Sequence, residues 1–203
     1  MIPRCIIFDL GKVLVDFDYG IAIRKIAERA HVSVAEIEQA IHQSPLLFRY
    51  EIGEINREQF YHEVCEATGF CGSLEEFGDF FADIFTPIKP MIELHAQLRA
   101  RQLPTFILSN TNDLAIAHIR RNFPFFANFT GYIFSYEHGA MKPDARLYQT
   151  VEQIAGTSGD GLLFLDDLSE NIAAAQARGW QVIHHQTPEQ TIGAVRDLLK
   201  IGN

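Results

Sequence analysis

Two patterns of apolar residues divide the chain. Cys5-Ile6-Ile7-Phe8 is a short apolar run of strand length that ends at an aspartate. After Pro87 and Pro90, similar runs alternate with stretches whose apolar residues recur every three or four positions, as in a helix. We predict four later strands, at 105–108, 131–135, 161–165 and 181–184. Strands that alternate with helices indicate an α/β fold with a parallel five-stranded sheet and helices on both faces.

Between the first strand and the two prolines, the pattern is helical alone. Ser33 with Glu36 three residues on is a capping-box pattern, and Asn56 and Ser73 begin further helices. We therefore predict that residues 17–86 are all helical and that the prolines mark a hinge. The expected organisation is a core of residues 1–16 and 87–203, interrupted after its first strand by a small all-helical insert of residues 17–86.

The composition narrows the class of partner. The chain has 203 residues, enough for one core with a small insert, and 26 acidic against 17 basic residues give a formal charge of -9. So acidic a chain is a poor candidate for nucleic-acid binding. An anionic ligand would need local positive charge from a bound cation, a lysine or a helix N-terminus.

The cysteines and the apolar runs bear on the compartment. The three cysteines, Cys5, Cys65 and Cys71, are an odd number without metal-ligand spacing, which favours reduced thiols in a reducing compartment. No apolar run approaches membrane-spanning length, and the first strand begins too early to leave room for a signal peptide. We expect a cytoplasmic protein that does not bind membranes.

Polar residues of matching chemistry follow four of the predicted strands. The first strand ends at Asp9, the next at Ser109 and Asn110, the third leads to Lys142, and the fourth ends at Asp166 and Asp167. Ligands of open α/β sheets lie at the carboxyl ends of the strands, so these side chains are expected at one edge.

This set of side chains suits a metal and a phosphate. Three carboxylates that converge without nearby basic partners would repel one another, so we expect a hard divalent cation, Mg²⁺, to neutralise them. Ser109 and Asn110, placed at the start of a helix, and Lys142 would bind a phosphate. Each residue alone has a plainer explanation. Asp9 could cap the next segment, Lys142 could lie on the surface, and the acid pair could form a turn before a Ser169 helix cap. The four motifs together favour a catalytic site over these structural roles.

At this point the sequence resembles a known family. Asp9-Leu10-Gly11-Lys12-Val13-Leu14, Ser109-Asn110-Thr111, Lys142-Pro143-Asp144 and Asp166-Asp167-Leu168-Ser169-Glu170-Asn171 resemble the four ordered motifs of the haloacid dehalogenase (HAD) superfamily. The helical insert resembles the small cap of its subfamily IA, and the core would be Rossmann-like. The pattern is most similar to the sugar phosphatase branch typified by the bacterial α-D-glucose-1-phosphate phosphatase, whose first motif also has a glycine.

The resemblance implies roles for these residues. Asp9 would be the nucleophile that forms an aspartyl-phosphate, Ser109 and Asn110 would hold the phosphoryl oxygens, and Lys142 would stabilise the developing charge. Asp167 would bind Mg²⁺ together with Asp9 and the carbonyl of Gly11. Asp166 would bind the ion directly or through water.

Gly11 departs from the pattern of most phosphatases in the superfamily, which have a general acid and base at that position. Loss of such a group typically lowers the rate about a hundred- to ten-thousand-fold. A sugar phosphorylated on its anomeric oxygen is a better leaving group than an ordinary alcohol, which fits a glycine here. Asp16 and Asp18 are candidate substitutes, although we expect them to shape the hinge into the insert.

We therefore predict a magnesium-dependent phosphatase that acts on a small phosphorylated metabolite, such as the sugar phosphate hexose 1-phosphate, as a monomer or homodimer. One alternative is a 2-haloacid dehalogenase, which uses the same nucleophile and needs no metal. Others are a non-catalytic binding or regulatory protein of the same fold and a phosphomutase, which would depend on the missing acid even more heavily.

Overall fold

The computed structural model describes residues 1–42 and 44–201, and its centre is a five-stranded sheet. The strand order is β5-β4-β1-β6-β7, and all neighbouring strands pair in parallel. The strands are β1 (Cys5–Phe8), β4 (Thr105–Ser109), β5 (Gly131–Phe134), β6 (Leu162–Asp166) and β7 (Gln181–His184). The predicted parallel five-stranded α/β sheet is confirmed.

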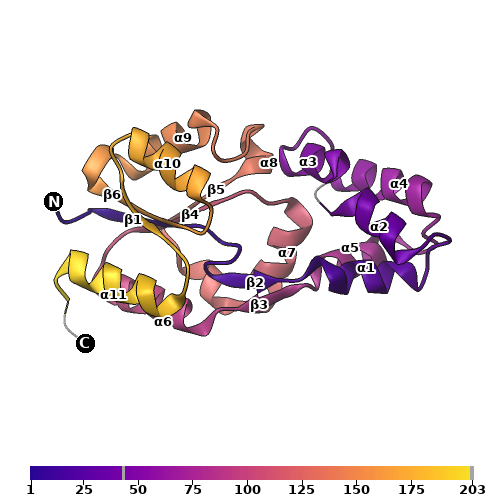
Figure 1. Ribbon diagram of the computed structural model, residues 1–203, viewed down its shortest axis with the longest axis horizontal. Coiled ribbons are helices and arrows are strands. Elements are labelled where there is room, and N and C mark those ends of the chain that lie inside the picture. The colour runs from indigo at the N-terminus through magenta and orange to yellow at the C-terminus, as the bar shows by residue number, and fades with distance from the viewer. Residues whose placement is uncertain (43, 202–203) are drawn as a thin grey trace.

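Helices cover both faces of this sheet because successive strand residues point to opposite sides. Ile6 and Phe8 belong to a core with α6 (Lys89–Ala100), α7 (Asp113–Asn122) and α11 (Pro188–Leu199). Cys5 and Ile7 belong to a second core with α9 (Ala145–Ala155) and α10 (Ser169–Ala177). In Figure 1, α9 and α10 lie on one side of the sheet, and α6 and α11 lie on the other. The short α8 (Ser135–His138) and the 3₁₀ turns η1 (Pro124–Asn128) and η2 (Gly159–Gly161) lie in the connections.

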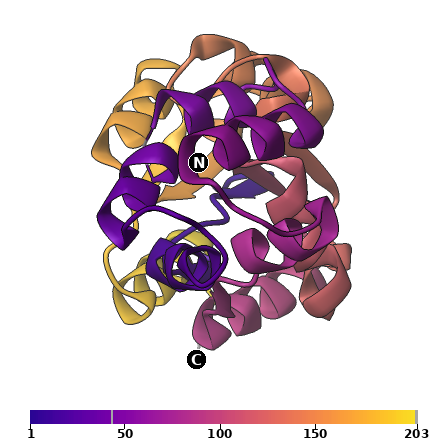
Figure 2. The same cartoon turned by 90° about the vertical axis from the view of Figure 1, so that its right-hand side faces the viewer.

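Five helices form a separate bundle at one end of the molecule (Figure 1), and Figure 2 looks onto that end. They are α1 (Tyr19–Ala27), α2 (Val34–Ile41), α3 (Pro45–Glu51), α4 (Arg57–Thr68) and α5 (Leu74–Ala82). Ser33 forms the predicted capping box with Glu36, and Asn56 forms another. The bundle has its own apolar core, rich in phenylalanine. We call these helices the helical insert and the remainder the α/β unit. The division at residues 17 and 86 stays a prediction.

The connections to the insert differ from the prediction. Val15–Phe17 (β2) and Phe85–Pro87 (β3) form a two-stranded antiparallel ribbon, so the prediction that residues 17–86 are all helical is wrong at both ends. Strands of three residues are too short to show an alternating pattern, and these two pair only because the fold brings distant segments together. Pro87 ends the second strand, and Pro90 lies in the first turn of α6.

One predicted helix cap is also wrong. α10 begins at Ser169 itself, with Leu168 at the cap position and no side-chain cap. The carboxylate of Asp166 accepts the N–H of Leu168 at 2.8 Å, which fixes the turn before the helix, and the N–H groups of Asn171 and Ile172 donate to the Leu168 carbonyl.

Membrane-spanning helices need about 20 mostly apolar residues. Across residues 1–42 and 44–201, no helix has the length and apolar character to cross a bilayer.

Candidate active site

The ends of β1 and β6 bring three carboxylates together at one edge of the sheet. Asp9 follows β1 directly, Asp166 is the last residue of β6 and Asp167 comes next. Each offers an oxygen, and these oxygens lie within 4.8 Å of one another. The strand register explains their proximity, since Phe8 pairs with Leu165 and both strands leave the sheet at the same level.

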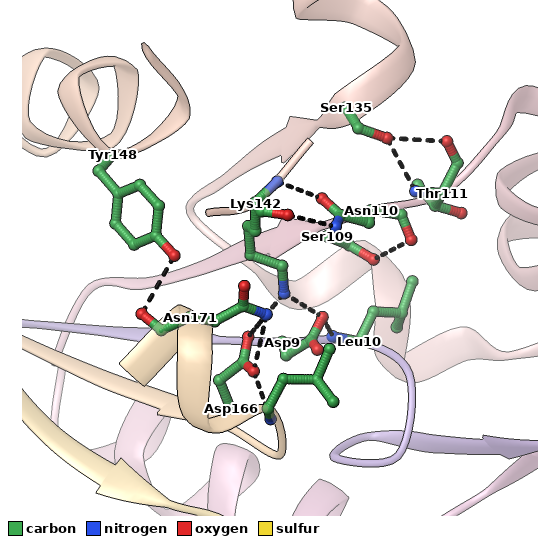
Figure 3. A network of polar contacts seen from close by, with 11 residues as sticks. Asp9, Leu10, Ser109, Asn110, Thr111, Ser135, Lys142, Tyr148, Asp166 and Asn171 are labelled. Carbon is green, nitrogen blue, oxygen red and sulfur yellow. Dashed lines mark hydrogen bonds and ion pairs between the residues drawn. The ribbon is translucent and has the colours of Figure 1, made fainter. Parts of the chain in front are cut away.

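Lys142 joins two of these acids. It comes from the loop before α9, and its Nζ lies 2.8 Å from Asp9 Oδ1 and 2.7 Å from Asp166 Oδ2 (Figure 3). Burial alone would lower the pKa of Lys142, but the charges of Asp9 and Asp166 outweigh it and raise the pKa, so the lysine stays charged. The expectation that the carboxylates lack a basic partner is therefore wrong, because the loop after β5 turns back over the ends of the other strands.

Asp166 is held by donors on both oxygens. Oδ1 accepts from the N–H of Leu168, and the Asn171 amide donates to Oδ1 and Oδ2 at 3.0 and 3.1 Å. With Lys142, these donors satisfy a carboxylate that is fully buried. The contacts favour a positioning role for Asp166. Asp167 is only half-buried and lines the adjacent cavity.

The charge state of Asp9 depends on its surroundings. Burial raises the pKa of Asp9 to about 7, Lys142 opposes the shift, and the charges of Asp166 and Asp167 add to it. A carboxylate that attacks as an anion therefore gains from a further cation, because positive charge lowers its pKa.

The donor set fits a divalent cation. Carboxylate oxygens are preferred ligands of Mg²⁺, and the three acids offer a compact group of them. Asn171 Oδ1 gives a second indication, since it is buried and has no hydrogen-bond partner within the described residues. Buried polar atoms are rarely unpaired, and water bound to a cation would supply the missing donor. Gly11 lines the same cavity as Asp9 and Asp167. The ligand roles of these residues stay predictions.

Ser109 and Asn110 lie beside Lys142, but not at a helix start. Ser109 ends β4, whereas α7 begins at Asp113 with Asn112 as its cap, so the expected placement is wrong by several residues. The side chain of Asn110 accepts from the backbone N–H of Lys142 at 2.7 Å and donates to its carbonyl at 3.1 Å. These two bonds fix the lysine loop. The predicted contacts of Ser109 and Asn110 with phosphate remain untested.

This arrangement of four motifs agrees with a family profile, described as haloacid dehalogenase-like hydrolase, that matches residues 3–179. The chain belongs to this hydrolase family. It is accordingly an enzyme.

Curated relatives of this HAD-like hydrolase include phosphatases. The Sesquiterpene phosphatase astK of Aspergillus oryzae is 26% identical over 97% of this chain and 96% of its own length. Phosphatase MT3486 of Mycobacterium tuberculosis is 29% identical over 60% of this chain and 56% of its own length. The chain also matches the mouse Acyl-CoA dehydrogenase family member 10 at 27% identity, but spans only 19% of it.

Solved structures share the fold. A HAD-like family hydrolase from Porphyromonas gingivalis superposes with a TM-score of 0.84 at 25% identity, covering 98% of this chain and 99% of that one. A HAD family enzyme from Bacteroides thetaiotaomicron, in complex with magnesium and inorganic phosphate, gives 0.80 at 23%, with 91% and 94% covered. An L-2-haloacid dehalogenase from Xanthobacter autotrophicus is more distant, at 0.63 and 19%, with 93% and 80% covered.

Two cavities meet in front of the carboxylates of this hydrolase. One, of about 630 Å³, contains Asp9, Lys142 and Asp167 and reaches Glu38 and His42 of the insert. We call it the polar chamber. The other, of about 470 Å³, extends toward α3 and is lined mainly by apolar side chains. Both chambers have Gly11, Phe17, Tyr19, His42, Asn110 and Leu168 in their walls.

Phe17 fills the space that a side chain at position 11 would need. A Cβ placed on Gly11 would lie 2.9 Å from Phe17 Cε1. Tyr19 and Phe85 pack edge-on against the Phe17 ring, with centroids at 5.7 and 6.2 Å, and hold it in place. The Phe17 ring thus occupies the space that the side chain of a general acid at position 11 would need.

The candidate substitutes for that acid have structural partners. Asp16 lies in β2 and pairs with Lys12. Asp18 lines the polar chamber, but its carboxylate caps α1 by accepting the N–H of Gly20. Both observations agree with the interpretation that these acids shape the entry into the insert.

Sequence reasoning assigned no role to two residues that support the site. Asn171 lies in the first turn of α10 and holds Asp166. The signal for it was its place at the end of the fourth motif, five residues after that acid. His184 Nε2 lies 2.8 Å from the carbonyl of Asp167 and ties that loop to β7. Only the pairing of β6 with β7, which places Asp166 opposite His184, brings these two segments together.

Proposed function

We propose that this hydrolase is a magnesium-dependent phosphatase that transfers the phosphoryl group of a small phosphorylated metabolite to Asp9 and then to water. The observation that carries the proposal is the strand edge itself, where a buried lysine contacts the proposed nucleophile and a third acid, Asp167, stays open to the cavity. The phosphatase names of two relatives support this reaction over haloacid hydrolysis.

Asp9 would attack through Oδ2, since Oδ1 already accepts from Lys142 and from the N–H of Leu10 at 2.6 Å. A bond forms between Oδ2 and phosphorus, and the ester P–O bond breaks. Water then attacks phosphorus, which releases Asp9 and inorganic phosphate. Lys142 remains protonated and stabilises the negative charge in both steps.

In this proposal Asp9, Asp167 and the Gly11 carbonyl would hold Mg²⁺. Asp166, whose oxygens already accept from Lys142, Leu168 and Asn171, would bind the ion directly or through water. The ion, when bound, neutralises phosphate and carboxylate charge. Ser109 and Asn110 would hold phosphoryl oxygens, and Asn110 also keeps the Lys142 loop in place.

We propose a sugar phosphate, such as hexose 1-phosphate, as the first substrate class to test. With no acid at Gly11, the leaving group must depart with little help, and an anomeric oxygen does so more readily than an alkoxide. The polar chamber supports this class, because Lys12, Glu38 and His42 could bind sugar hydroxyls. We place the enzyme in the cytoplasm, in keeping with its three free cysteines.

The test is phosphate release from a panel of sugar and nucleotide phosphates, with Mg²⁺ or with EDTA. We expect release to require Mg²⁺ and to be fastest on an anomeric phosphate. Asp9→Asn should lower kcat at least about a thousandfold, as expected for loss of a nucleophile, while circular dichroism confirms its fold. Release that persists in Asp9→Asn would contradict the proposed nucleophile. Turnover of haloacids without a metal would favour the dehalogenase alternative.

A further inference from the structure

The second cavity beside the carboxylates has a different chemistry from the first. Its walls include Leu10, Phe17, Leu47, Phe48, Phe85 and Leu168. We call this cavity of about 470 Å³ the apolar chamber. Cavities of this size with apolar walls and a few polar groups are typical of small-molecule sites.

Two walls of the apolar chamber are large apolar side chains left open to solvent. Phe48 on α3 is 52% exposed, and Leu168 after β6 is 46% exposed. They face the cavity from the helical insert and from the α/β unit. An apolar ligand between them would remove both side chains from water, and this burial would favour binding.

The apolar chamber is continuous with the proposed phosphate site. Ser109, Asn110 and Gly11 line it, and the last two also line the polar chamber with Asp9. A phosphate bound at Asp9 would therefore have its ester oxygen near the junction, and the organic group could enter either chamber. Phe17, which fills the space at position 11, presents an apolar surface at that junction.

The polar groups in the chamber do not require a charged ligand. Burial raises the pKa of Glu51, at the end of α3, to about 7, so that near neutral pH it does not demand a cationic partner. Asn112 caps α7 by accepting the N–H of Ala115. The Asn112 side chain thus has a partner within the protein.

We propose that the apolar chamber binds the organic group of a second class of substrate, phosphate monoesters of apolar phenols, whose oxygen leaves more readily than an ordinary alkoxide. This inference rests on the proposed phosphatase reaction and adds to the sugar phosphates a class that the polar chamber alone would not favour. The chemistry is unchanged. The ester P–O bond breaks as Asp9 takes the phosphoryl group, the phenoxide leaves and takes a proton from solvent, and water then attacks phosphorus and releases Asp9 and phosphate.

A matched pair of esters tests the chamber. Phenyl phosphate and 4-butylphenyl phosphate have leaving groups of similar acidity, so the missing acid at Gly11 affects them alike. Each buried methylene contributes about fourfold, and partial burial of the butyl group should raise kcat/KM at least about tenfold over phenyl phosphate. A ratio near one in the wild-type enzyme would overturn the inference.

Phe48→Ser is the variant that addresses the chamber, and Val34→Ser is its control. Val34 is the first residue of α2, is 49% exposed and lines neither chamber. Phe48→Ser should lower the 4-butylphenyl to phenyl ratio about three- to tenfold, and Val34→Ser should leave it unchanged. Equal ratios in both variants would contradict a role for Phe48.

A binding experiment separates this inference from the proposed function. Titration calorimetry of 4-butylbenzylphosphonate against benzylphosphonate needs no turnover, so it decides the matter even if neither ester is hydrolysed. Tighter binding of the butyl compound, weakened by Phe48→Ser, would support the chamber. Equal affinities would refute it, whatever the result of the phosphate-release panel.

Discussion

Polar contacts stabilise two regions of the molecule in different surroundings. One is the strand edge, where Asp9, Lys142 and Asp166 meet, and the other is the interface between the helical insert and the α/β unit, which we call the seam. At the edge, the Lys142 side chain is 1% exposed and touches two buried carboxylates. At the seam, Tyr50 and Arg57 of the insert reach Asp113 at the start of α7. There the side chains of Arg57 and Asp113 are 39% and 28% exposed.

This difference in exposure determines how much free energy is lost when each contact breaks. A buried charge that loses its partner cannot be solvated by water, so the edge must stay intact in the folded protein. A seam pair can exchange its partner for water at small cost. If the insert moves to admit substrate, the contacts at the seam are the ones that can break at small cost, because water can replace them.

The largest expected effect comes from breaking the edge. Lys142→Met removes the cation and leaves Asp9 and Asp166 buried without it, which should lower the free energy of unfolding by about 3–5 kcal/mol. Urea denaturation at pH 7 measures this change. Lys25→Met is the control, because it breaks the more exposed pair with Asp83, and its cost should stay below about 1 kcal/mol. Equal losses in the two variants would contradict the comparison.

The loss in Lys142→Met should also depend on pH. Burial already raises the pKa of Asp9 to about 7, and Lys142→Met removes the charge that opposes that increase. A carboxyl whose pKa is higher in the folded state contributes stability that is lost as pH rises through that pKa. The variant should therefore be closest to the wild type near pH 5 and furthest from it near pH 8, when both are measured without divalent cations.

The strand edge could be predicted from the sequence because its determinants are local. A strand of known direction ends at Asp9 and another at Asp166, and parallel strands must deliver these residues to one side. Lys142 was found for the same reason, although its contacts with the acids were not. A lysine that follows a strand gives no information on which neighbour its long side chain will reach.

The seam and the two chambers could not be predicted in this way. The β2–β3 ribbon, the packing of Phe17 against Gly11 and the reach of Tyr50 to Asp113 each join segments that are far apart or have weak patterns of their own. Such contacts depend on how the insert folds back over the sheet. The sequence shows an apolar face on the insert but not which of its phenylalanines stay exposed, as Phe48 does.

A substitution at Gly11, which lies between the strand edge and the seam, should have an intermediate effect on the free energy of unfolding. Gly11→Asp restores the acid that most phosphatases of the family have, but its Cβ would meet the Phe17 ring at 2.9 Å. Overpacking of this kind costs about 1–3 kcal/mol. Phe17→Ala makes room for the new side chain. Gly11→Asp should therefore cost less stability when it is added to Phe17→Ala than when it is added to the wild type. The thermal midpoints of the three variants and the wild type measure this coupling, and additive effects would show that Phe17 is not the obstacle.

The smallest effect is expected at the seam. Tyr50→Phe keeps the ring stacked on Phe60, with centroids 4.4 Å apart, and removes the hydroxyl that contacts Asp113 and accepts the N–H of Leu114. One such hydrogen bond contributes about 1 kcal/mol. Because Asp113 keeps Arg57, the insert should stay folded but be held less firmly over the chambers, and KM should rise severalfold with kcat nearly unchanged.

Tyr61→Phe distinguishes this effect from a general loss of stability. The Tyr61 hydroxyl donates to the carbonyl of Gly72 at 2.6 Å, a bond that lies within the insert and does not cross the seam. Its removal should cost a similar free energy of unfolding and leave KM at the wild-type value. If both tyrosine variants raise KM alike, the Tyr50–Asp113 contact has no special part in holding the insert over the site. If only Tyr50→Phe raises KM, a contact worth about 1 kcal/mol is enough to hold the helical insert in place over the site.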